Sequence, residues 1–156
     1  MDAFPADVQV EADGPEWLIV SMEVPGIAAG ELLGWFVDAR KINAWWGSEA
    51  IVEPRPGGRY LVHWPSTGWT MRGAVATLAG DSLTYSWTWD HEPDQAPRMV
   101  QVHVGTSASG AVVTIVHGPY RDGSAGDPEA RTDRAGHREG WLYFLPQLRA
   151  KIASAL

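Results

Sequence analysis

The chain contains no cysteine, which excludes disulfides, thiol catalysis and thiolate metal sites. Lysine is nearly absent, because Lys41 and Lys151 are the only two in 156 residues, and the ten arginines are scattered. Nucleic-acid binding draws on clustered basic side chains, so the net charge of −7 argues against it. No apolar run approaches the roughly 20 residues that a membrane-spanning helix needs, so we expect no membrane insertion.

The N-terminal segment also lacks the features of a secretory signal. Residues 1–7 are acidic and carry neither a basic start nor an apolar stretch, so we expect a cytoplasmic protein. Residues 1–15 contain Asp, Gly and Pro without periodicity and are interpreted as a loose leader. Because the remaining length fits one domain, we expect a single domain over 16–156.

Alternating and near-helical patterns predict the order of the elements. We expect a strand over 17–24, short helices over 28–37 and 42–46, strands over 50–53, 59–64, 69–78, 82–89, 99–106 and 111–117, and a helix from Thr132 or Asp133 to about 154. Short turns between the strands indicate an antiparallel meander. In the central hairpin we favour a three-residue loop, which pairs Met71 with Trp89, over a two-residue turn, which presents Arg72 to Trp89.

The last helix should carry one buried stripe, because its apolar residues follow i, i+4, i+7, i+11 spacing: Trp141, Leu145, Leu148 and Ile152, with Phe144 beside them. A helix with one apolar side and a sheet with one apolar face must bury these surfaces against each other. The pattern therefore predicts an α+β fold in which an antiparallel sheet of about seven strands packs against a long C-terminal helix. Two short helices should follow the first strand.

What the chain has in abundance is tryptophan, with nine residues. In the segment 83–89, Tyr85, Trp87 and Trp89 alternate with small hydroxylated residues and so share one face of a strand. Rings of this size pack poorly in a small interior but suit the wall of a ligand cavity. A filled aromatic core is the alternative interpretation of the same face.

Several short segments, in this order, resemble the activator of heat-shock protein 90 ATPase homologue-like family, within the START/Bet-v-1-like (SRPBCC) superfamily. They are Ala44-Trp45-Trp46-Gly47, Pro56-Gly57-Gly58-Arg59-Tyr60, Gly73, residues 83–87, residues 113–117, and Gly140-Trp141 with Leu145 and Leu148. The resemblance implies the helix-grip fold, in which a curved antiparallel sheet wraps around the long C-terminal helix. It also implies a cavity between sheet and long helix, where superfamily members bind lipids, steroids, polyketides or plant hormones.

From the aromatic face of the strand and the family resemblance together, we expect the chain to bind a hydrophobic, aromatic or polycyclic small molecule between the sheet and the last helix. The expected ligand-binding residues are Trp46, Trp69, Met71, Tyr85, Trp87, Trp89, His117, Tyr120, Trp141 and Phe144. His117 follows an alternating apolar face and should point inward, where it would serve either as a polar contact or as a structural histidine bonded to a loop carbonyl.

Two other function classes stay open. One is a cyclase or aromatase acting on a polyketide-like substrate, in which His117 and Tyr120 would move protons. The other is a co-chaperone-like interaction module, which predicts Trp17, Trp35 or Trp64 in an exposed patch. A homodimer through a sheet edge is a further alternative. We expect no metal or cofactor, because the five histidines lack i, i+2 or i+4 spacing and no phosphate-binding glycine pattern occurs.

Overall fold

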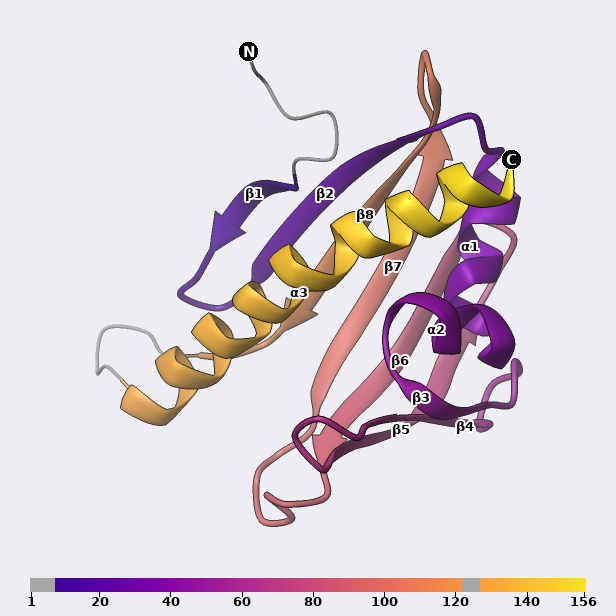
Figure 1. Ribbon diagram of the computed structural model, residues 1–156. Helices are drawn as coiled ribbons and strands as arrows, with labels where there is room; N and C mark the ends of the chain where they lie inside the picture. Colours follow the sequence, from indigo (N-terminus) through magenta and orange to yellow (C-terminus); the bar gives the residue numbers. More distant parts are fainter. Residues whose placement is uncertain (1–7, 122–126) are drawn as a thin grey trace.

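A computed structural model describes residues 8–121 and 127–156, which form an antiparallel sheet and three helices (Figure 1). The strands are β1 (Gln9–Asp13), β2 (Leu18–Pro25), β3 (Ser48–Val52), β4 (Arg59–Trp64), β5 (Trp69–Leu78), β6 (Ser82–Trp89), β7 (Arg98–Thr106) and β8 (Gly110–Gly118). The helices are α1 (Ala29–Val37), α2 (Ala39–Trp45) and α3 (Pro128–Ala155). Within the described residues, no helix is long and apolar enough to cross a membrane.

The eight strands form one sheet in the order β1-β2-β8-β7-β6-β5-β4-β3, with every neighbouring pair antiparallel. Figure 1 shows α3 running diagonally across one face of the sheet, with α1 and α2 on the same face. This confirms the helix-grip fold. The expected count of about seven strands is one too low, and the two short helices follow the second strand rather than the first.

The additional strand is β1, which lies within the segment interpreted as a loose leader. β1 pairs with β2, with a register shift between Val10 and Ala12. Asp13 at its end accepts hydrogen bonds from Arg134 (2.8 Å) and Arg138 (2.7 Å) of α3. β1 therefore ties the N-terminal half of α3 to the edge of the sheet.

The last helix begins earlier than predicted. Asp127 caps it by accepting hydrogen bonds from the backbone amides of Glu129 and Ala130, and Pro128 occupies the first turn. Neither Thr132 nor Asp133 is the cap. The expected stripe is buried and longer than predicted, comprising Ala130, His137, Trp141, Leu145, Leu148 and Ile152.

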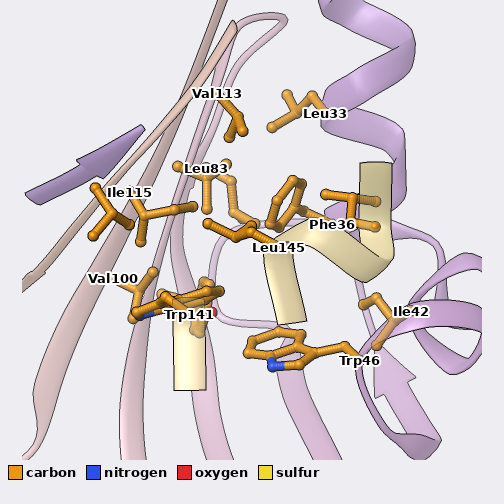
Figure 2. Packing of buried hydrophobic residues seen from close by; sticks show 14 of the residues in the cluster. Leu33, Phe36, Ile42, Trp46, Leu83, Val100, Val113, Ile115, Trp141 and Leu145 are labelled. Atoms are coloured by element: carbon orange, nitrogen blue, oxygen red, sulfur yellow. The ribbon is translucent and has the colours of Figure 1, made fainter. Parts of the chain in front are cut away.

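One continuous core lies between this stripe and the sheet. Figure 2 shows Leu145 pointing among Leu83, Val113 and Ile115 of the sheet and Phe36 of α1. These five side chains are fully buried, so the middle of the interface between α3 and the sheet is filled. The interior here is a packed core rather than an open cavity.

The central hairpin has the favoured pairing away from its turn, because Met71 lies opposite Trp89. At the turn itself Leu78 pairs with Leu83 and the Ala79 amide donates to the Ser82 carbonyl at 2.9 Å, so the loop is the two-residue turn Gly80-Asp81 rather than the favoured three-residue loop. A bulge between Val75 and Thr77 places one additional residue on β5 and shifts the register to the favoured pairing. Trp87 and Trp89 are thereby kept on the face that α3 covers.

Candidate ligand-binding site

Six of the nine tryptophans line one cleft beside α3, with a volume of about 190 Å³. We call it the aromatic cleft. Its lining residues are Trp46, Trp64, Ser66, Thr67, Trp69, Trp87, Trp89, Gly136, His137, Gly140, Trp141 and Phe144.

Three strand ends bring four of these rings together. Trp64 and Trp69 pair across the β4–β5 turn, and Trp87 and Trp89 are alternate residues at the end of β6. The Trp89 ring contacts the rings of Trp64 (5.6 Å between centroids), Trp69 (5.3 Å) and Trp87 (5.3 Å), all edge to face. Trp69, at 46% exposure, is at the rim.

Trp46 reaches the cleft from the end of α2. Its ring stacks on Trp45 (5.2 Å, 8° between planes) and packs against Trp141 of α3 (5.2 Å, 32°). The Trp64 indole N–H donates to the Trp46 carbonyl at 2.6 Å. Gly47 permits this approach, because a Cβ there would lie 2.6 Å from Val62 Cγ1 and 2.8 Å from the His63 carbonyl oxygen.

The wall that α3 contributes is notched by two glycines one helical turn apart. A Cβ added at Gly136 or Gly140 would meet no atom within 4 Å, although both residues line the cleft. Residues four apart lie on the same helix face. The missing side chains of Gly136 and Gly140 therefore help to form the open space.

The aromatic cleft opens onto a larger space of about 700 Å³, which we call the outer groove. The two spaces share Trp69, Trp89, Gly136 and His137; the rest of the outer groove is lined by His91, Glu92, Gln95, Pro128, Glu129, Thr132 and Asp133. It thus lies between the first turns of α3 and the loop over residues 90–97. Arg72 holds the base of this loop through two hydrogen bonds to the Asp90 carboxylate (3.0 and 2.9 Å).

Behind the cleft lies a buried polar cluster, made of Arg98, His117, Tyr120, Asp133 and His137. The two histidine rings stack at 4.1 Å, with 11° between their planes. His137 Nδ1 lies 2.7 Å from the Tyr120 hydroxyl, and its Nε2 lies 3.4 Å from Asp133 Oδ1. Arg98 donates to the other Asp133 oxygen at 2.9 Å.

Burial decides the protonation states in this cluster. Burial lowers the pKa of His137 to about 4, although the nearby Asp133 carboxylate raises it by a smaller amount. Burial also holds the pKa of His117 well below its usual value. Burial also raises the pKa of Tyr120, so its phenol stays protonated. Because the Trp141 indole N–H donates to His117 Nδ1 at 3.1 Å, the proton of neutral His117 is on Nε2.

The structure divides the ten expected ligand-binding residues into two sets. Those that line the aromatic cleft are Trp46, Trp69, Trp87, Trp89, Trp141 and Phe144. Met71 and Tyr85 lie in the core instead, where the Tyr85 ring stacks on Tyr60 at 3.9 Å. His117 and Tyr120 belong to the polar cluster and line neither space. The hydrogen-bond partner of His117 is a tryptophan rather than a loop carbonyl.

Sequence reasoning missed six residues that line the aromatic cleft: Trp64, Ser66, Thr67, Gly136, His137 and Gly140. Trp64 shares the alternating face of Tyr60 and Val62, which could have identified it. His137 precedes Trp141 by one helical turn and so continues its stripe, and Gly136 precedes Gly140 by the same spacing. Trp64 is 9% exposed, which removes it from the exposed patch that an interaction module would need.

The fold and this geometry can now be compared with known proteins. Residues 29–153 match the family described as Activator of Hsp90 ATPase homolog 1-like protein. The chain belongs to this family. Among curated proteins, none matches the chain in sequence.

Several solved structures share the fold of this chain. A protein from Rhodobacter sphaeroides has a TM-score of 0.75 at 17% identity, covering 95% of this chain and 99% of its own. The AHSA1 protein from Silicibacter pomeroyi has a TM-score of 0.68 at 24% identity, covering 90% and 99%. DynU16, from the dynemicin biosynthetic locus, has a TM-score of 0.72 at 19% identity, covering 91% of this chain and 49% of DynU16. These likenesses show the fold.

Proposed function

We propose that this protein binds a hydrophobic, aromatic or polycyclic small molecule in the aromatic cleft. The observation that carries the proposal is that six tryptophans from four separate parts of the chain line one open space. Aromatic walls with a few polar groups are typical of small-molecule sites. The cyclase alternative rested on His117 and Tyr120, and because neither lines the cleft or the groove, binding is the function that the geometry favours.

The dimensions limit the size of the ligand. A dry cavity of about 150 Å³ accepts benzene, so the 190 Å³ of the aromatic cleft suits a small ring system. A larger ligand would extend past Trp69 and Trp89 into the outer groove, whose 700 Å³ is within the usual range for ligand sites. Stacking on these rings contributes about 0.5–1.5 kcal/mol per pair beyond area burial.

The glycine notch on α3 provides the test. We expect naphthylmethanol to bind the unchanged protein in calorimetry, and Gly140→Leu to weaken this binding at least about tenfold, because the new side chain would occupy the cleft. The same substitution should keep or raise the free energy of unfolding, since leucine is a better helix former than glycine by roughly 0.5–1 kcal/mol.

Gly30→Leu in α1 is the matched control. A Cβ at Gly30 also meets no atom within 4 Å, but Gly30 lies outside the cleft. This variant should keep the affinity of the unchanged protein. Equal affinities in both variants, or no binding by the unchanged protein, would contradict the proposal.

A further inference from the structure

The outer groove carries charge of one sign. Three carboxylates line it, from Glu92 in the loop over 90–97 and from Glu129 and Asp133 on α3, and no Lys or Arg side chain lines it. Asp133 is neutralised by its ion pair with Arg98. Glu92 and Glu129 have no hydrogen-bond or ion-pair partner for their carboxylates among the residues that the structure describes. Two carboxylates without an ion-pair partner therefore stand at the mouth of the site.

Aromatic faces lie beside these charges. The rings of Trp69 and His91 stack at 4.5 Å, and Trp89 contacts both, at 5.3 Å from each centroid. All three residues line the outer groove. Tryptophan faces attract cations through the ring quadrupole, and cages of such rings are a known way to bind quaternary ammonium groups. Carboxylates next to aromatic faces strengthen that preference.

We infer that the ligand is an aromatic cation, with its ring system in the aromatic cleft and an amine or quaternary ammonium group in the outer groove. The inference rests on the proposed binding function and adds the charge of the ligand. Trp69 and Trp89, shared by both spaces, would contact the junction of ring and cation. Glu92 and Glu129 would supply the electrostatic attraction.

Three probes with one ring system and different charges test the inference: naphthylmethyl-trimethylammonium, naphthylmethanol and naphthylacetate. In calorimetry at low salt we expect the cation to bind about tenfold more tightly than the alcohol, and the anion to bind least. The advantage of the cation should shrink at high salt, because the two glutamates are exposed to solvent.

Two double variants locate the effect. Glu92→Gln with Glu129→Gln should reduce the preference for the cation to less than about twofold while leaving alcohol binding unchanged. Glu31→Gln with Glu139→Gln removes the same charge from exposed positions outside both spaces and should keep the preference.

The outcomes separate the two proposals. If the alcohol binds and the cation binds no better, or if the preference survives in Glu92→Gln with Glu129→Gln, the charge inference is wrong and the binding function stands. If none of the three probes binds, both fall.

Discussion

The side chain of His137 belongs both to the wall of the candidate binding site and to the buried polar cluster. It lines both the aromatic cleft and the outer groove, yet its ring stacks on His117 in the interior. Two imidazole rings at this distance are compatible with burial only while both are neutral, because two charges so close would repel each other in a low dielectric. The contribution of the polar cluster to the free energy of unfolding therefore depends on pH.

The sign of that dependence follows from the lowered pKa values. The unfolded chain binds protons at the usual histidine pKa of about 6.5, whereas folded His137 binds one only near pH 4. We expect the free energy of unfolding to fall as the pH drops from about 6.5 to about 4, with His137 accounting for roughly 3 kcal/mol of the loss. Urea titrations across this range would measure it.

His137→Gln provides the comparison, because glutamine stays neutral throughout. Its unfolding free energy should be lower at neutral pH but should depend less steeply on pH. His103→Gln, at an exposed position, should keep the original slope. A slope that is the same in all three proteins would show that His137 is not the titrating group.

At the scale of single residues, the sequence identified side chains well where their type and period agreed. Trp87, Trp89 and Trp141 were found because large rings recur at strand or helix spacing. His137 was missed because a search for an apolar stripe passes over a histidine, although its burial within that stripe is what the spacing implies. The contact between Tyr120 and His137 joins two parts of the chain whose pairing no local pattern encodes.

At the scale of elements, β1 matters through its contact with α3. The pKa of Asp13 is lowered, chiefly by the hydrogen bond from Arg134, with Arg138 adding a second bond. These are the only ionic contacts that join β1 to α3 among the described residues. Loss of the Asp13 charge would remove this ionic contact between β1 and the helix end that forms one wall of the outer groove.

We expect Asp13→Asn to lower the free energy of unfolding by about 1 kcal/mol, because the pair is partly exposed and partly screened by solvent. The effect should diminish at high salt. Urea denaturation would measure both. Asp94→Asn, in the exposed loop over 90–97, serves as the control and should change stability by less than about 0.5 kcal/mol. Equal effects of the two substitutions would argue against a stabilising role of the contact between Asp13 and α3.

Most elements were predictable because one face of each is buried, so that strands alternate and α3 shows its stripe. β1 was not, since its residues are nearly all exposed and carry no apolar alternation. The start of α3 was misplaced for a different reason. Asp127 followed by Pro128 is a strong helix-start signal, but residues 119–131 are rich in Gly, Asp and Arg, a composition typical of a loop.

At the scale of the whole molecule, the space between α3 and the sheet is filled at one end and open at the other. Around Leu145, Leu148 and Ile152 the core is closed, whereas around Gly136 and Gly140 it opens into the cleft. The resemblance to helix-grip proteins implied a cavity but not its position. That position depends on how Met71 and Tyr85 pack, on a scale of ångströms that sequence spacing does not specify.

This division predicts where ligand binding is felt. In hydrogen exchange, saturation with naphthylmethyl-trimethylammonium should slow exchange in the loop over 90–97 and in residues 128–141 of α3, because bound ligand would bridge these walls. The filled end, including β2 and residues 148–155, should change little, since its amides are already protected by the core. Protection confined to the filled end would place the site elsewhere. Slower exchange along the whole chain would instead indicate a general rise in stability rather than a ligand held at the open end.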